Sequence, residues 1–192
     1  MNPTSGPVDR AEIERLTQEY GGDWGSNHTR RLLKLIAIIG QDQVYDEAVV
    51  WTAAHLHDWG GYGAWAQPGV DHALRSAEVA AAFLAERGLP PAFIERVAAC
   101  IREHHNGNPA KSIEAILLSD ADALDFLGVI GLVRDFSKKA RDLRSGYETV
   151  VRRKAKSLAV LCLARSQQVA AARVATLEQA LAAFEAESFG DF

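Results

Sequence analysis

The segment Ala53-Ala54-His55-Leu56-His57-Asp58-Trp59-Gly60-Gly61 decides the fold prediction for this chain. From about residue 46 the sequence is rich in Val and Ala at helical spacing, and Gly60-Gly61 is expected to end that helix. The adjacent residues His57 and Asp58 therefore close a helix. Histidine and carboxylate side chains are the ligands that borderline and hard divalent metals prefer. The segment predicts metal ligands at the end of a helix.

Further residues of the ligand types occur on both sides of this pair, most of them at the ends of expected helices. They are His28, His72, His104, His105 and Asp122. Side chains at helix ends can converge on one point while the apolar faces below them pack, which favours an open catalytic site over a closed structural one. The whole set exceeds the need of one ion. It matches two ions that share a carboxylate such as Asp58.

Helical periodicity dominates the whole chain, and the alternation typical of strands is nearly absent. The expected helices cover about residues 9–20, 27–40, 46–58, 71–87, 91–105, 112–126, 128–143 and 147–186. Asp9 is the expected N-cap of the first helix, and Gly21-Gly22 is expected to end it. The last range is too long for one helix to be assumed. The sequence predicts an all-α, single-domain helical bundle.

The domain organisation follows from this pattern, because no linker, repeat or low-complexity segment interrupts it. Residues 1–24 are expected to form an N-terminal helix and linker that pack on the core. Residues 25–145 are expected to form the metal-binding core. Residues 146–192 are expected to be a C-terminal helical extension of the same domain.

Composition narrows the function classes. The 192 residues suffice for one domain with a sizeable core, and a net charge near −4 gives no case for a nucleic-acid polymer as partner. Cys100 and Cys162 lie in apolar helical patterns, as small buried residues of a reducing compartment would. No signal peptide and no apolar run of bilayer length are seen, so a cytoplasmic protein without membrane contact is expected.

The ordered motifs resemble the HD-domain superfamily of metal-dependent phosphohydrolases, which is named for its adjacent His-Asp pair. The matching segments are residues 27–30, 53–58, 72–77, 101–105 and 118–125. The resemblance covers roughly residues 25–145, and small single-domain bacterial HD hydrolases are particularly similar over residues 120–136. It implies an HD-type bundle with a first metal held by His28, His57, Asp58 and Asp122.

The His104-His105 pair also resembles the HD-GYP phosphodiesterase branch of that superfamily. This likeness implies a second metal held by His72, His104, His105 and Asp58. The branch's Gly-Tyr-Pro is replaced by Gly107-Asn108-Pro109, so a cyclic dinucleotide substrate does not follow. Family members also often carry a Lys soon after His-Asp, where this chain has Trp59-Gly60-Gly61.

Several of these residues have a plainer interpretation beside the functional one. His55 is expected to be structural, and His72 with His104 could be a buried pair rather than ligands. The role of His105 is open, because the side chains of adjacent residues on a helix point about 100° apart unless the helix has ended. Asp120 is expected to be exposed or capping. Asp125 is either a surface charge or a residue that orients a ligand histidine.

Two further features lie outside the ligand set. Basic residues concentrate between residues 134 and 156, where a solvated helical face competes with a cationic rim that attracts a phosphorylated substrate. Arg134 and Lys138, four residues apart, are the expected substrate contacts. The loop with Trp59, Tyr62 and Trp65 is either a lid or a packed segment.

The resemblance implies a divalent-metal-dependent phosphohydrolase that cleaves a phosphate ester of a nucleotide or other small phosphorylated metabolite through metal-activated water. Asp58, His72 and His104 are the expected catalytic residues, with one or two ions of Mn, Mg, Ni, Zn or Fe. The alternatives are a mixed-valent di-iron oxygenase like myo-inositol oxygenase, an HD-type hydratase and, least favoured, a nucleotide-sensing module. A homodimer is an arrangement that the sequence leaves open.

Overall fold

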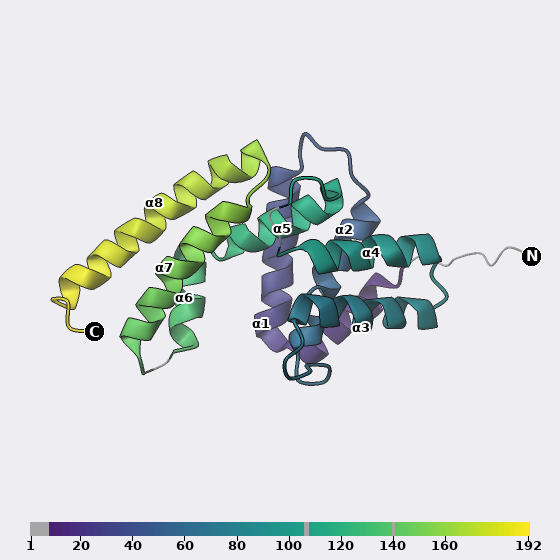
Figure 1. Ribbon diagram of the computed structural model, residues 1–192, viewed down its shortest axis with the longest axis horizontal. Helices are drawn as coiled ribbons and strands as arrows, with labels where there is room; N and C mark the ends of the chain where they lie inside the picture. Colours follow the sequence, from purple (N-terminus) through teal and green to yellow (C-terminus); the bar gives the residue numbers. More distant parts are fainter. Residues whose placement is uncertain (1–7, 106–107, 140) are drawn as a thin grey trace, which may run out of the picture. The chain divides into compact units, whose positions relative to one another are not determined.

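The protein is described from a computed structural model that covers residues 8–105, 108–139 and 141–192. Over these residues it has eight α-helices, a short 3-10 turn and no strand (Figure 1). The elements are α1 (Arg10–Ile39), α2 (Glu47–Leu56), the turn η1 (Trp59–Gly61), α3 (His72–Glu86), α4 (Pro91–Glu103), α5 (Ile113–Asp125), α6 (Val129–Ser137), α7 (Leu143–Val160) and α8 (Ala164–Glu187). The prediction of an all-α fold is confirmed.

The chain divides into two compact units, residues 1–119 and residues 120–192. We call them the N-terminal unit and the C-terminal unit, and we describe each by itself. The division falls within α5, inside the range that the sequence assigns to the metal-binding core. The expected boundaries after residues 24 and 145 stay a prediction.

In the N-terminal unit, α1 packs against α2, α2 against α4, and α3 against both α4 and η1. The core is formed by large apolar side chains that are almost fully buried, among them Leu32, Ile36, Val49, Leu56, Trp59, Val97 and Ile101. Burying one such side chain contributes roughly 1.5–3 kcal/mol. Leu56 and Trp59 flank the His57-Asp58 pair and are both wholly buried, so packing fixes the backbone of the two expected ligands.

Helix α1 joins two helices that the sequence predicts separately. Asp9 caps it as expected, since its carboxylate accepts a hydrogen bond of 3.0 Å from the backbone N–H of Glu12. The backbone leaves helical geometry at Gly22, with φ 58° and ψ −161°, and helical structure resumes directly afterwards. Glycine tolerates this positive φ, so the expected break occurs as a kink rather than as a gap.

Two of the helices expected in the C-terminal unit have other bounds in the structure. The one expected over residues 128–143 ends at Ser137, and the long one is divided into α7 and α8, which lie side by side (Figure 1). The division follows from Asp120, whose buried carboxylate accepts hydrogen bonds from the backbone N–H groups of Cys162 and Leu163 at 3.0 and 2.9 Å. Asp120 therefore anchors the connection between α7 and α8 across 43 residues of chain. Because Asp120 is buried, the prediction of an exposed residue is wrong.

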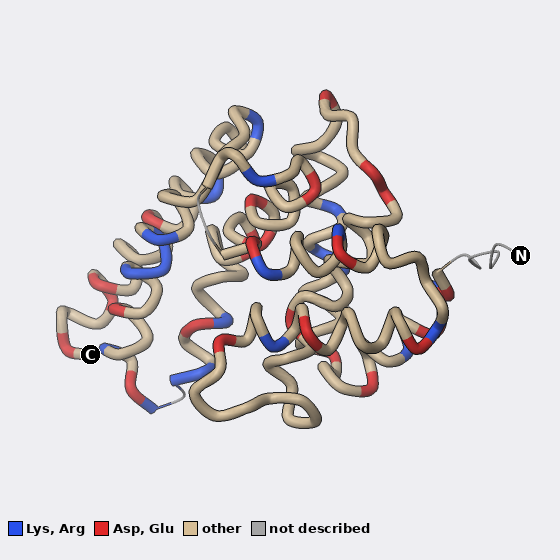
Figure 2. The backbone as a smooth tube through the Cα atoms, turned by 45° about the vertical axis from the view of Figure 1, so that its right-hand side comes forward, with Lys and Arg blue, Asp and Glu red and all other residues tan. Residues whose placement is uncertain are grey.

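Charged residues of both signs are interspersed along the chain, as Figure 2 shows. Many form surface ion pairs, such as Arg87 with Glu12 and Lys154 with Glu178. Among the described helices, none is both long enough and apolar enough to cross a membrane.

Candidate metal centre

His57 occupies the C-cap of α2, and the contacts of its ring are those expected of a metal ligand. The ring is buried, and its Nδ1–H donates to the carbonyl of Ala54 at 2.9 Å. A carbonyl can only accept, so Nδ1 carries a proton, and in the neutral ring the lone pair is on Nε2. Nε2 is buried and has no hydrogen-bond partner among the residues that the structure describes. A bound metal ion would explain this otherwise costly nitrogen.

Asp58 lies between two sets of histidines, and each carboxylate oxygen faces one set. Oδ2 is 3.5 Å from Nε2 of His57 and 3.8 Å from Nε2 of His28. Oδ1 is 3.8 Å from Nε2 of His72. About 30% of the Asp58 side chain is exposed, so one side of this carboxylate stays open to solvent. This is the arrangement expected of a carboxylate that bridges two ions.

The first ligand group consists of His28, His57 and Asp58. Their ligand atoms lie within 4.8 Å of one another, and the two imidazole rings are 5.3 Å apart. His28 comes from the part of α1 that follows the kink and is almost fully buried. The fourth predicted ligand, Asp122, is a buried residue of α5 in the C-terminal unit. Its membership of the site stays a prediction.

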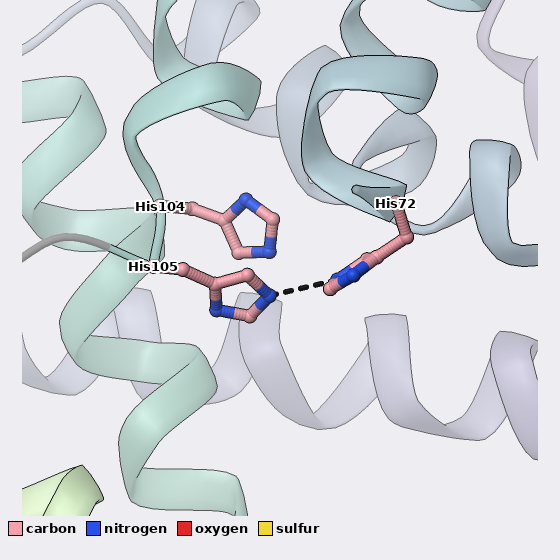
Figure 3. A group of neighbouring side chains, drawn as sticks. All are labelled: His72, His104 and His105. Atoms are coloured by element: carbon pink, nitrogen blue, oxygen red, sulfur yellow. Dashed lines mark hydrogen bonds between the residues drawn. The ribbon is translucent and has the colours of Figure 1, made fainter. Parts of the chain in front are cut away.

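The second ligand group consists of His72, His104 and His105 (Figure 3). His72 is the first residue of α3, whose N-cap Asp71 accepts from the backbone N–H groups of Ala73 and Leu74. His105 and His72 face each other with their Nε2 atoms 2.7 Å apart. The His104 ring lies 3.7 Å from the His105 ring and 5.8 Å from the His72 ring. The three rings thus enclose one point from two helices.

His104 repeats the local geometry of His57. It is the C-cap of α4, it is buried, and its Nδ1–H donates to the carbonyl of Ile101 at 2.6 Å. That hydrogen bond assigns the lone pair to Nε2. Because α4 ends at Glu103, His104 and His105 are no longer held on diverging helical directions, and both can turn to the same side.

His55 has contacts that account for it without a metal. Its Nδ1–H donates to the carbonyl of Trp51 at 2.9 Å, and its ring packs at 3.9 Å on the indole of that residue. Burial lowers the pKa of His55, so the ring is held in its neutral form. The structural interpretation of this residue fits the structure.

The two expected substrate contacts differ in their surroundings. Arg134 is buried, and its guanidinium pairs with the buried carboxylate of Asp125 at 2.7 Å and lies 4.5 Å from the ring of Phe126. The alternative of Asp125 as a surface charge is therefore wrong, while Arg134 as a substrate contact stays a prediction. Both side chains are engaged within the C-terminal unit. Lys138 is exposed at the C-cap of α6, and its role stays a prediction.

The aromatic loop after Asp58 is packed and gives no support for a lid. Trp59 is wholly buried, and its Nε1–H donates to Oγ1 of Thr17 at 3.1 Å. The Trp65 ring stacks on Trp59 with centroids 4.9 Å apart. Tyr62 lies against α1, where a Cβ at Gly25 would come within 2.3 Å of its hydroxyl. Sequence reasoning missed these anchors, because the partners are 37 to 42 residues away on α1 and nothing local marks them.

The comparisons with known proteins agree with this geometry. The family model described as HD domain matches residues 25–127, more than half of the chain. No curated protein matches the sequence of this chain. The chain belongs to the HD domain family. Residues 106–107, which include Gly107 of the segment that replaces Gly-Tyr-Pro, lie outside the described residues.

Solved structures similar to the chain share its helical fold over nearly the full length. A predicted HD superfamily hydrolase from an uncultured Thermotogales bacterium is 26% identical, with a TM-score of 0.67, covering 93% of this chain and 92% of that one. Bacillus subtilis YpgQ is 22% identical, with a TM-score of 0.72 and coverage of 92% and 94%. The structure of YpgQ in complex with ADP is 23% identical, with a TM-score of 0.71, covering 92% of this chain and 93% of that one. The chain is a metal-dependent hydrolase of the HD superfamily.

Proposed function

We propose that the chain hydrolyses a phosphate ester of a nucleotide or another small phosphorylated metabolite, using two divalent ions that share Asp58. The observation that carries this proposal is the position of the Asp58 carboxylate. Its Oδ2 faces His28 and His57, and its Oδ1 faces His72. An unshared carboxylate would need only one set of histidines around it.

The residues present fit divalent ions. The buried, unpartnered Nε2 of His57 supplies a lone pair that the protein leaves unused. A mixture of imidazole and carboxylate suits Mn, Ni, Zn or Fe, and Mg is favoured less as imidazole ligands increase. His28, His57 and Asp58 would hold one ion. His72, His104 and His105 would hold the other together with Asp58.

Each residue has a distinct task in this mechanism. When bound, divalent ions lower the pKa of a coordinated water and offset the charge of a phosphoryl group. Asp58 would set the spacing of the two ligand groups, and its open side leaves room for substrate. His57 and His104 keep their Nε2 lone pairs in place through their Nδ1–H hydrogen bonds to backbone carbonyls. Where the second group holds no ion, His72 and His105 share a proton between their Nε2 atoms, and His72 can protonate the leaving oxygen.

Nucleotides are the first substrate class to test, because the structure of the similar YpgQ was determined with ADP. That the partner is neither a nucleic-acid polymer nor a membrane stays a prediction from the sequence. A cytoplasmic location and a homodimer remain predictions from the sequence.

The proposal is tested with a panel of nucleotides and other phosphorylated metabolites against protein loaded with Mn, Mg, Ni, Zn or Fe. We expect phosphate release from at least one substrate, and a loss of about a hundredfold or more in Asp58→Asn, which keeps the shape but lacks the charge. Asp23→Asn removes an exposed carboxylate of α1 as a matched control. Undiminished activity in Asp58→Asn would refute the shared-carboxylate mechanism. A mixed-valent di-iron EPR signal with substrate-dependent O₂ uptake would replace the hydrolase by an oxygenase.

A further inference from the structure

Two hydrogen bonds join the loop that follows Asp58 to α3: a buried one at Gly60, and one of 3.0 Å that Nε–H of Arg75 donates to the carbonyl of Trp65. The backbone N–H of Gly60 donates to Oγ of Ser76 at 2.8 Å, and both residues are buried. A Cβ at position 60 would lie 2.3 Å from the backbone nitrogen of Ser76, so the two segments touch through backbone. Only glycine permits this approach.

The position of this bond relates it directly to the ligands. Gly60 follows Asp58 by two residues. Ser76 follows His72 by four residues, which is about one helical turn, so His72 and Ser76 share a face of α3. The hydrogen bond therefore joins the backbone beside the carboxylate to the helix that carries His72. Oδ1 of Asp58 and Nε2 of His72, which are 3.8 Å apart, belong to the two segments that this bond joins.

A different set of contacts fastens the same loop to α1. Trp59 donates its Nε1–H to Thr17, and Tyr62 lies against Gly25, three residues before His28. These two contacts hold Asp58 beside His28, and the Trp59 ring also packs edge-to-face on Phe83 of α3 with centroids 5.0 Å apart. The two sides of the loop thus position different ligand groups.

We propose that Ser76 is a positioning residue for the second ion, which it helps to retain by fixing His72 relative to Asp58. This inference rests on the proposed function insofar as it requires two ions. Loss of the Ser76 hydroxyl would release the start of α3 and leave the group on α1 and α2 in place. Outer hydrogen-bonding partners of metal ligands typically change metal affinity 10–100-fold.

The test is a calorimetric titration of the metal-free chain with Mn²⁺, combined with EPR of the manganese-loaded protein. His72→Ala and His28→Ala serve as references that weaken one ligand group each. We expect two binding events in the wild type, and in Ser76→Ala a weakening of at least tenfold that is confined to the event weakened in His72→Ala. An exchange-coupled two-manganese EPR signal should fade in Ser76→Ala while the single-ion signal remains.

Thr17→Val is the matched control, since it removes a buried hydroxyl that holds the same loop from the α1 side. It should not selectively weaken the event assigned to His72. The inference is overturned if Ser76→Ala binds two ions like the wild type, if it weakens both events equally, or if Thr17→Val gives the same selective loss. A wild type that binds one ion overturns it too. Two tightly bound ions without any phosphatase activity would instead contradict the proposed function alone.

Discussion

Arg134 and Asp125 show how a charge that suggests substrate binding can serve the fold instead. Less than a tenth of either side chain is exposed, and their charged atoms are 2.7 Å apart. Removing one partner of a buried pair leaves the other charge uncompensated, which costs far more than the pair contributes. The basic stretch in the sequence does not reveal this, because burial depends on how α6 packs within the C-terminal unit.

We expect Arg134→Ala to lower the free energy of unfolding by about 3 kcal/mol, because the buried carboxylate of Asp125 would lose its ion pair with Arg134. Urea denaturation at neutral pH measures this change. Lys138→Ala, at an exposed position on the same helix, should change stability by less than about 0.5 kcal/mol. A raised KM in Arg134→Ala at unchanged stability would instead support Arg134 as a substrate contact.

The buried Cys100 is expected to resist alkylation in the folded state. Burial raises the pKa of this thiol to about 12, so at pH 8 only about one molecule in ten thousand carries the reactive thiolate. Cys162 is only partly buried, between α7 and α8. Mass spectrometry after brief iodoacetamide treatment should find Cys162 modified first, and equal modification in urea. Faster modification of Cys100 in the folded state would contradict its burial.

At the scale of the element, α2 illustrates how a helix brings its ligands to the site. Its N-cap Asp46 accepts from the backbone N–H groups of Ala48 and Val49 at 3.0 and 3.3 Å, and it pairs with Arg96 of α4. Burial alone would raise the pKa of Asp46. The backbone hydrogen bond from Val49 and the ion pair with Arg96 outweigh burial, so the pKa lies below its ordinary value.

Asp46→Ala should therefore destabilise the protein by about 1 kcal/mol at neutral pH. The folded-state pKa is lowered, so this stabilisation is fully present above the unfolded pKa of about 3.9 and is lost as the pH falls through the folded value. Urea denaturation from pH 7 down to pH 3 should show the difference between variant and wild type shrinking only at the acid end. A difference that grows in acid would contradict the lowered pKa.

The positions of His57, His72 and His104 at helix ends were predictable, because each lies beside an apolar stripe and a turn signal. His57-Asp58 before Gly60-Gly61 is the clearest case. His28 was expected at the start of a helix but lies within α1, because Gly22 only kinks that helix. The division between α7 and α8 was not predictable, since it depends on Asp120 reaching backbone groups more than 40 residues away. The same holds for Ser76, whose hydroxyl matters only once Gly60 is folded against it. Local patterns do not encode such distant partners.

At the scale of the whole molecule, the two ligand groups draw on α1, α2, α3 and α4 of the N-terminal unit. A ligand that binds only the folded state stabilises it by about 2.7 kcal/mol at a hundred times its Kd. Metal binding should therefore raise the stability of the N-terminal unit, which supplies these side chains. The sequence implies one further ligand, Asp122, in the other unit.

Hydrogen exchange with and without Mn²⁺ should separate the effect of metal binding on the N-terminal unit from its effect on α5, which carries Asp122. We expect added metal to slow exchange around His28 within α1, at the carboxyl ends of α2 and α4 and at the start of α3, and chelation by EDTA to reverse the effect. Protection that extends to α5 in the wild type but not in Asp122→Ala would establish the fourth ligand of the first group. Unchanged exchange around His57 and His104 would contradict both ligand groups.

The hydrogen bonds that His57 and His104 donate have an electrostatic consequence. Each ring bonds a carbonyl in the final turn of its own helix, where backbone acceptors otherwise lack intrahelical partners. A helix carries roughly half a negative charge at its carboxyl end, and here that end lies directly behind a neutral ligand. The macrodipoles of α2 and α4 thus make the two imidazoles better electron donors. The backbone itself adds to the attraction for cations in a site where most ligands are uncharged.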